Sequence, residues 1–111
     1  LAVATRHLSD GVPVQMEERL VNLAAAPDAA AERFRDTPPG RWLLDHVPWT
    51  EAEHAISAEN APARIAARLC IAAGAACLVV ERRTWNGQMP VTFARLWHPG
   101  ARHRLVGRFS A

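Results

Sequence analysis

The last third of the chain, residues 77–109, alternates apolar and polar positions in two strand-like runs joined by Asn86-Gly87. Asn-Gly between such runs is a strong signal for a tight β-hairpin, because both central residues of a type I′ turn need positive φ. A turn at Pro99-Gly100 and a third short run follow. The pattern therefore predicts a three-stranded meander, and we expect the rest of the chain to pack against it.

A second hairpin is predicted at the start of the chain. Residues 1–8 alternate loosely, residues 9–11 have turn chemistry, and residues 13–22 alternate again. One face of the second strand is polar: Gln15, Glu17 and Arg19. Because this pair of strands opens at residue 1 with no lead-in, we expect the domain to be incomplete at its N-terminus.

Helical patterns lie between the two hairpins. They cover residues 24–34, 41–47 and 62–69, and an alternating pattern over 49–58 predicts one more strand. The order β-β-α-α-β-α-β-β-β predicts an α+β domain, an antiparallel sheet covered on one side by helices. The 111 residues suit one domain, and the pattern reveals no internal repeat.

Charge is distributed unevenly along the chain. All thirteen basic residues are arginine, and the eleven acids lie between Asp10 and Glu81, so six arginines and no acid follow from Arg82 onward. Such a tail can bind nucleic acid or an anionic ligand, or it can be a solvated face balanced by acidic helices. The absence of stacking aromatics in series disfavours DNA binding by this part of the chain.

Cys70 and Cys77 are the only cysteines, and both sit among apolar residues. We expect two buried, reduced thiols rather than a disulfide, and hence a cytoplasmic protein. No apolar run reaches membrane-spanning length and no signal-peptide pattern opens the chain, so no membrane partner is predicted.

Catalytic signatures are scarce. The sequence has no Gly-rich phosphate loop, no G-x-S-x-G and no H-E-x-x-H. His98 and His103 with a cysteine do not form a closely spaced ligand pair, which disfavours a metal site. The sequence therefore predicts neither an enzyme nor a cofactor.

A binding pocket is the more plausible kind of site. On the strand over residues 90–98, four residues share one face and combine polar and apolar atoms, as ligand cavities do: Thr92, Ala94, Leu96 and His98. Glu17 and Arg6 are the nearest charged candidates in topology. On the pattern alone, Thr92 can equally fill an ordinary strand position, and the other polar residues can equally be exposed.

Several segments together resemble one known family: GVPVQMEERLVN, PWTEAEH, CLVVERRTW, PVTFARLWHPG and RHRLVGRF. In this order they look like the UTRA effector-binding domain of GntR-type bacterial transcription regulators, in the branch of the histidine-utilisation repressors. The resemblance implies a fold like chorismate lyase, with residues 1–111 forming the UTRA domain. It also implies a winged-helix DNA-binding domain upstream, a homodimer, and a small effector that shifts DNA affinity.

The effector contacts of that family fall, by resemblance, on five positions of this chain: Arg6, Glu17, Thr37, Thr92 and His98. Sugar-sensing relatives usually carry an acid where Thr92 stands, which argues against an aminosugar. The histidine branch implies urocanate, whose carboxylate suits an arginine and whose imidazole suits Glu17, Thr92 and His98. The chain departs from the family at His103, usually tyrosine, and at Leu20, often aromatic.

The sequence leaves other interpretations of the function open. The pocket can take a different small anionic metabolite, the domain can be an enzyme like chorismate lyase, or it can be a dimerisation module with a vestigial pocket. In the favoured reading, operator DNA is contacted only through the upstream domain.

Overall fold

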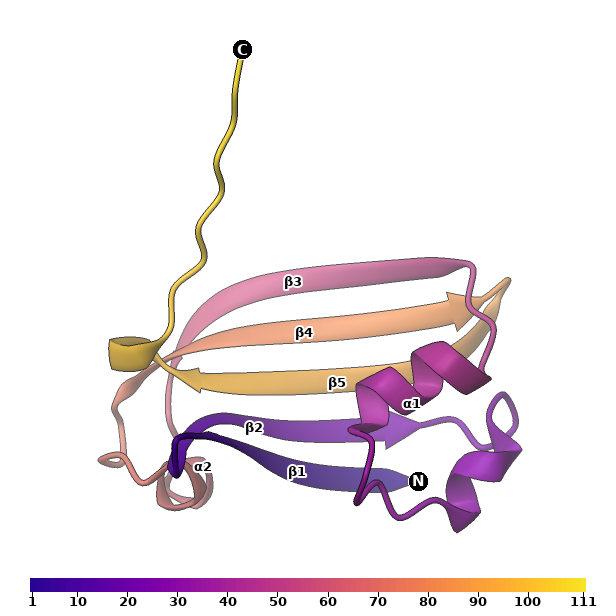
Figure 1. Cartoon of the computed structure of the whole chain (residues 1–111), viewed down its shortest axis with the longest axis horizontal. Helices are drawn as coiled ribbons and strands as arrows, with labels where there is room; N and C mark the ends of the chain where they lie inside the picture. The colour runs from indigo at the N-terminus through magenta and orange to yellow at the C-terminus, as the bar shows by residue number, and fades with distance from the viewer.

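The computed structural model describes all residues, 1–111, and contains one five-stranded antiparallel sheet with strand order β1-β2-β5-β4-β3 (Figure 1). The strands are β1 (Ala2–Ser9), β2 (Val12–Val21), β3 (Glu51–Asn60), β4 (Ala76–Asn86) and β5 (Met89–Pro99). The helices are α1 (Pro39–His46), α2 (Ala63–Leu69) and two short 3₁₀ turns, η1 (Pro27–Ala31) and η2 (Gly100–Arg102). The two predicted hairpins are confirmed, and they meet at the centre of the sheet through β2 and β5.

The two hairpins repeat one irregularity that the sequence pattern did not reveal. On β2, Val14 is the extra residue of a β-bulge directly after a proline. On β5, Val91 holds the same position after another proline. When the two bulges are aligned, Glu17 is equivalent to Ala94 and Arg19 is equivalent to Leu96. At the centre of the sheet Glu17 pairs with Leu96, and Arg19 pairs with Ala94. The two hairpins are therefore related by an approximate two-fold axis. The repeat is structural, because apart from Pro-Val the turns SDGVPVQ and NGQMPVT share no residue in register.

The tight turns themselves differ. Asp10 and Gly11 both have positive φ, 51° and 77°, as a type I′ turn requires. In the second hairpin, Asn86 pairs with Met89 and only Gly87, the first central residue, has positive φ, at 61°. This arrangement is typical of type II′, so the predicted hairpin is right and the predicted turn type is wrong.

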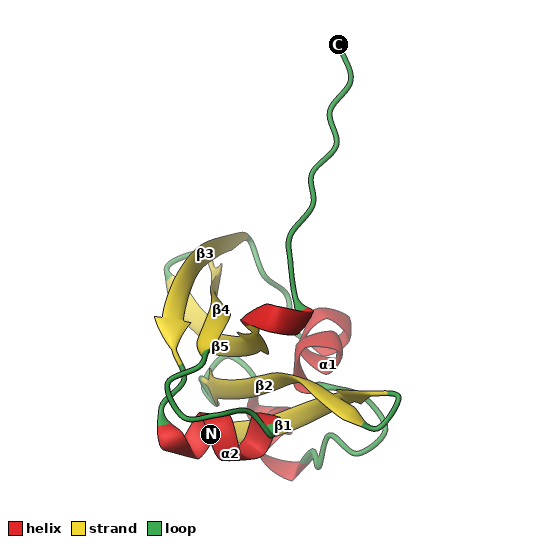
Figure 2. Ribbon diagram, turned by 90° about the vertical axis from the view of Figure 1, so that its left-hand side faces the viewer, coloured by secondary structure: helices red, strands yellow, loops and turns green.

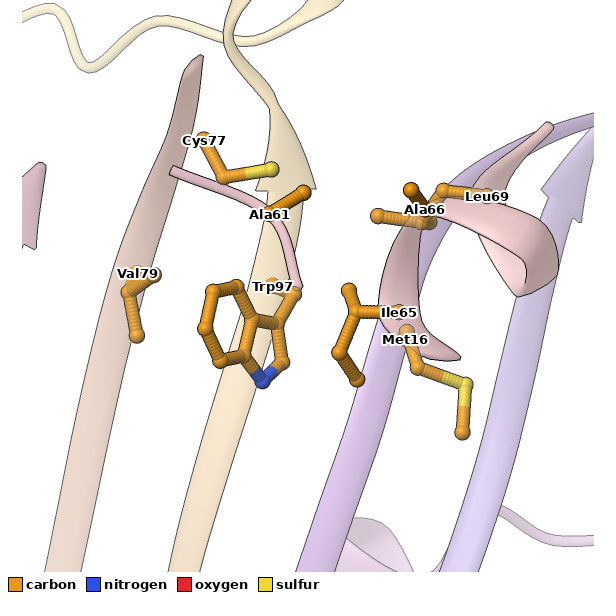
Figure 3. Close-up of a cluster of buried hydrophobic side chains, with 8 residues drawn as sticks. All are labelled: Met16, Ala61, Ile65, Ala66, Leu69, Cys77, Val79 and Trp97. Atoms are coloured by element: carbon orange, nitrogen blue, oxygen red, sulfur yellow. The ribbon is translucent and has the colours of Figure 1, made fainter. Parts of the chain in front are cut away.

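The helices cover both faces of the sheet, near opposite ends, and not one side as predicted (Figure 2). The short helix α2 packs on one face, where Ile65 and Leu69 are fully buried against Met16, Val79 and Trp97 (Figure 3). Burial of these side chains contributes about 1.5–3 kcal/mol each. The face that carries Trp97 is therefore closed at this end.

On the opposite face, α1 and η1 pack over the other end of β2 and β5. Trp42 and Leu43 of α1 are buried with Val21 and Val91. The indole of Trp42 is also stacked on His46, one turn later, with ring centroids 4.5 Å apart. The bulge at Val91 matters here, because the extra residue adds a valine to this apolar contact.

Three predicted features take a different form. The helix expected over residues 24–34 is reduced to η1, which has no side-chain cap. Phe34, beyond η1, has a φ of 55°, which is incompatible with a right-handed helix. Cys70 is exposed in a left-handed conformation that ends α2, whereas Cys77 is buried as expected. The strand expected after Pro99-Gly100 does not form, and the chain leaves the domain unpaired (Figure 1).

Candidate ligand-binding site

A cavity of about 490 Å³ lies between α1 and the face of the sheet that α1 covers. Polar side chains line the sheet side: His7 of β1, Gln15, Glu17 and Arg19 of β2, Arg82 and Thr84 of β4, and Thr92 of β5. Apolar side chains of α1 and the loop after it line the other side: Leu43, Leu44, Val47 and Trp49. A largely apolar hollow with a few placed polar groups is the usual form of a small-molecule site.

A buried ion pair forms the floor of this cavity. The guanidinium of Arg19 donates to both carboxylate oxygens of Glu17, from Nε over 3.1 Å and from Nη2 over 3.2 Å. Its Nη1 donates to the hydroxyl of Thr92 over 3.2 Å, and that hydroxyl donates to the carbonyl of Leu20 over 2.9 Å. Glu17 and Arg19 are 5% and 6% exposed, so the pair is held in a low-dielectric environment where geometry matters most.

Helix α1 closes tightly over this pair. At Gly40, in the first turn of α1, a Cβ atom would lie 3.1 Å from Nη2 of Arg19. A side chain at this position would therefore require the guanidinium to shift by a few tenths of an ångström. The glycine lets the helix backbone approach the cavity floor, and this is the close approach for which glycine is used.

The charge of the cavity is positive. Three arginines line it, Arg19, Arg41 and Arg82, against the single carboxylate of Glu17. Arg19 forms an ion pair with Glu17, and Arg41 forms an ion pair with Asp45 over 3.2 Å at the surface. Arg82 forms no ion pair within the chain and is exposed. A cation without a partner at the mouth of a cavity favours an anionic ligand.

His98 lies on the same face of the sheet, outside the cavity lining and next to the lining residue Gln15. Its Nδ1 is 3.1 Å from the carbonyl of Leu78, and its Nε2 is 2.9 Å from the side-chain amide of Gln15. Since the carbonyl can only accept, Nδ1 carries the proton and Nε2 accepts from Gln15. Burial lowers the pKa of His98, although the bond to Leu78 opposes the shift; the nearby His103 and Arg82 lower it further.

Two further properties bear on the chemistry. No group of three His, Cys, Asp or Glu side chains lies close enough together to hold a metal ion. None of the helices combines the length and the apolar character needed to cross a lipid bilayer.

A model of one protein family, the UTRA domain, matches residues 1–104. The chain belongs to the UTRA family. This UTRA domain is 49% identical over 104 residues to the histidine utilization repressor of Pseudomonas putida, across 94% of this chain and 42% of that protein. It is 43% identical over 105 residues to the histidine utilization repressor of Klebsiella aerogenes, across 95% of this chain and 44% of that protein. The chain thus spans less than half the length of these relatives.

Solved structures confirm the fold. The C-terminal domain of the histidine utilization repressor from Pseudomonas syringae pv. tomato superposes with a TM-score of 0.92 at 44% identity, over 99% of this chain and 78% of that one. The effector domain of PhnF from Mycobacterium smegmatis superposes with a TM-score of 0.85 at 17% identity, over 99% and 69%, and shows the fold alone. The curated relatives are named as repressors, and this agrees with the expected regulatory, non-enzymatic role.

The UTRA domain brings some of the five predicted contact residues together and separates others. Glu17 and Thr92 line the cavity, and His98 is joined to its wall through Gln15. Thr37 lies in the approach to α1, outside the lining. Arg6 lies on the opposite face, where Nη1 donates to the carbonyl of Arg68 at the end of α2 over 3.3 Å. Thr5, not Arg6, is the β1 residue that pairs with Glu17.

Two arginines that line the cavity of the UTRA domain, Arg19 and Arg82, were not among the five predicted contact residues. Arg19 was placed on the polar face of its strand, and that parity is correct, but alternation alone does not show that it chelates Glu17. Arg82 was visible only as the first residue of the acid-free part of the chain. The alternation of β4 could have identified Arg82 as a cavity residue. Arg82 pairs with Ala94, and Ala94 lies on the same face of β5 as Thr92.

Proposed function

We propose that this chain is the effector-sensing and dimerisation domain of a cytoplasmic histidine utilization repressor of the GntR class. The observation that carries the proposal is the cationic cavity over the buried Glu17–Arg19 pair, in a chain 43–49% identical to proteins that bear this name. Since the chain spans less than half of those relatives, contact with operator DNA is assigned to a winged-helix domain elsewhere in the full protein.

We propose urocanate as the effector. It is a flat molecule with an imidazole at one end and a carboxylate at the other. A guanidinium offers the carboxylate two parallel hydrogen bonds, and Arg82 is the cavity arginine whose donors are free. Arg82 thus takes the role expected for Arg6, which lies on the other face of the sheet.

The polar floor suits the imidazole. Its N–H needs an acceptor, and the carboxylate of Glu17 retains free lone pairs beside the bonds from Arg19. Its bare nitrogen needs a donor, and the amide of Gln15 has a second N–H beside the one given to His98. In this arrangement Thr92 and His98 act as positioning residues, Thr92 for Arg19 and His98 for Gln15.

Regulation follows by a shift of population. The effector must bind the dimer arrangement that cannot hold operator DNA more tightly than the one that can. Helix α1 is the element that a ligand in this cavity contacts directly, since it supplies the apolar wall. We propose α1 as the first element to respond.

A thermal-shift screen tests the proposal, because a ligand that binds only the folded state stabilises it by about 2.7 kcal/mol at a hundred times its Kd. Urocanate, histidine, formiminoglutamate and a sugar phosphate are compared at equal concentration, and urocanate is expected to give the largest rise in Tm. A response to another anion alone would replace urocanate as the effector. Silence from all four would leave a dimerisation module with a vestigial pocket.

Two further measurements address the remaining alternatives. Loss of the urocanate absorbance, or release of product from an aromatic carboxylate such as chorismate, would indicate an enzyme. The 111-residue chain is expected to give no specific complex with operator DNA in a gel shift, and such a complex would contradict the assignment of DNA binding to another domain.

A further inference from the structure

Trp49 is a large aromatic side chain that the packing of the domain does not use. It lines the cavity and is 48% exposed. It belongs to none of the three buried apolar clusters, and its indole is stacked on no other ring. Trp42 and Trp97, by contrast, are buried in those clusters. The uncovered part of the Trp49 indole is therefore available to a ligand in the cavity.

The backbone before Trp49 is fixed by the core. Val47 is buried with the apolar residues of α1, and its N–H donates to the carbonyl of Leu43 over 2.9 Å. Pro48 favours the extended conformation that Val47 adopts, with φ −124° and ψ 125°, and α1 ends at this point. Trp49 is thus one residue away from a proline and two from a buried anchor.

The turn between β4 and β5 fixes the backbone after Trp49, where the chain runs from α1 to β3 (Figure 1). The N–H of Thr50 donates to the carbonyl of Trp85 over 2.8 Å. The hydroxyl of Thr50 accepts from the N–H of Gly87 over 2.7 Å, and Gly87 has the positive φ of the tight turn. Because its backbone is held on both sides and its side chain has few rotatable bonds, Trp49 loses little conformational entropy when a ligand covers it.

The sheet carries small side chains next to this loop. Ala52 of β3 pairs with Thr84 of β4, and both line the cavity. The next pair along the same face is His54 with Arg82, which also line the cavity. A flat group can therefore lie against the small pair, beside the aromatic wall, with its carboxylate at Arg82.

We propose that Trp49 selects flat, conjugated ligands for this cavity by stacking its indole on the plane of the ligand. Offset stacking of aromatic rings is favourable beyond the burial of apolar area. A saturated chain of the same length and charge presents no continuous plane, so part of the contact is lost. Arg82 recognises only the carboxylate and cannot make this distinction. The inference deepens the proposed function, and it rests on the cavity being the effector site.

Two substitutions in the whole chain test the role of the indole. Trp49→Leu keeps an apolar side chain and removes the aromatic face, and the Kd for urocanate in calorimetry is expected to rise about 3- to 10-fold. Trp49→Phe keeps an aromatic face, and its Kd is expected to stay within about threefold of wild type. Both variants should keep a Tm close to that of wild type, because Trp49 lies outside the buried clusters.

A matched pair of ligands tests the selection itself. Imidazolepropionate has the imidazole and the carboxylate of urocanate joined by a saturated chain. The preference of wild type for urocanate over imidazolepropionate should shrink by about threefold or more in Trp49→Leu. Arg82→Ala should weaken both ligands equally and leave the preference unchanged, because both carry the carboxylate. An unchanged preference in Trp49→Leu would overturn the selection.

Indole fluorescence reports the contact directly. At the same urocanate concentration, quenching should be larger in wild type than in Trp49→Phe, whereas Trp85→Phe, outside the cavity lining, should retain the quenching. Equal binding of urocanate by wild type and Trp49→Leu would overturn the role of Trp49 and leave the proposed effector in place. A wild-type chain that does not bind urocanate would instead count against the effector, and with it against this inference.

Discussion

The side-chain amide of Gln15 donates a 2.9 Å hydrogen bond to Nε2 of His98, and this bond joins the wall of the cavity to the end of β5. Because Nδ1 already donates to the carbonyl of Leu78, the bond requires a neutral imidazole. His103 is stacked on the same ring, with centroids 4.0 Å apart, directly before the tail of residues 104–111 leaves the domain. One histidine thus connects the cavity, the central strand and the base of the tail.

The neutral state of His98 predicts a pH dependence of stability. Burial lowers its pKa in the folded protein below the ordinary value of about 6.5, so the unfolded chain binds the proton more readily. The free energy of unfolding should therefore fall as pH falls through 6.5 toward the lowered pKa. Urea unfolding between pH 7.5 and 5 measures the slope, which should flatten in His98→Gln but not in His54→Gln, an exposed control. An equal slope in wild type and His98→Gln would contradict the assignment.

Glu59 predicts a second, more acidic part of the pH dependence of the unfolding free energy. Its hydrogen bond with Arg95 lowers the pKa of the carboxyl below 4.5 in the folded state, against a smaller opposing effect of burial. The stabilisation is present above pH 4.5 and is lost as pH falls through the lowered pKa. In Glu59→Gln, the part of the acid unfolding curve below pH 4.5 should become shallower while the limb near pH 6 is unchanged.

Arg82 and Arg83 form a matched pair for testing ligand charge recognition. Arg82 lines the cavity, whereas Arg83 lies on the other face with its guanidinium 4.4 Å from the ring centre of Phe93. Arg82→Ala should weaken urocanate binding by about 10- to 100-fold, since a hydrogen bond to a charged group contributes about 1.5–3 kcal/mol. Arg83→Ala should leave the affinity near that of wild type. Calorimetry that finds equal losses for both would remove Arg82 from the site.

The buried ion pair predicts a large stability effect. Arg19→Ala leaves the carboxylate of Glu17 buried without its partner, and breaking such a pair costs about 3–5 kcal/mol of unfolding free energy. Arg41→Ala, which removes an exposed pair with Asp45, should cost no more than about 0.5 kcal/mol. Urea unfolding compares the two, and a small loss for Arg19→Ala would show that the cavity floor is better hydrated than its burial indicates.

Gly40 predicts a change in binding that is separable from stability. In Gly40→Ala the new methyl group meets Nη2 of Arg19 at 3.1 Å, so the guanidinium must shift by a few tenths of an ångström, while alanine in the first turn of the helix gains at most about 0.5–1 kcal/mol. We expect affinity for urocanate to fall several-fold with Tm nearly unchanged. Unchanged affinity would mean that Arg19 can move without altering the floor of the cavity.

The two thiols should differ in reactivity. Cys70 is exposed at the end of α2, whereas Cys77 is buried and burial raises its pKa. In the native protein an aromatic disulfide reagent should titrate one thiol rapidly and the second only after addition of urea. Cys70→Ser should abolish the rapid phase, and a rapid phase that persists in this variant would show that the strand carrying Cys77 opens readily.

Local pattern was sufficient for the hairpins and for the face of β5 that carries Thr92 and His98, because period-two alternation fixes parity within a strand. It was not sufficient for Arg6, because the partner of Glu17 depends on register between strands, and the bulge at Val14 shifts that register. A different limit applies to the ion pair of Glu17 and Arg19: both residues lie on β2, and alternation within that strand does not show that burial under α1 brings the two side chains together. Helix length also failed over residues 24–34, where alanine propensity without a cap supports only η1.

The bulged hairpins have a consequence for how the domain can change. At the centre of the sheet, the positions that hold Glu17 and Arg19 in one hairpin hold Ala94 and Leu96 in the other. One hairpin thus contributes a charged pair to the cavity, whereas the equivalent positions of the other hairpin contribute apolar side chains to the same face of the sheet. A descendant protein could acquire a new specificity by exchanging those two assignments, without rebuilding its backbone.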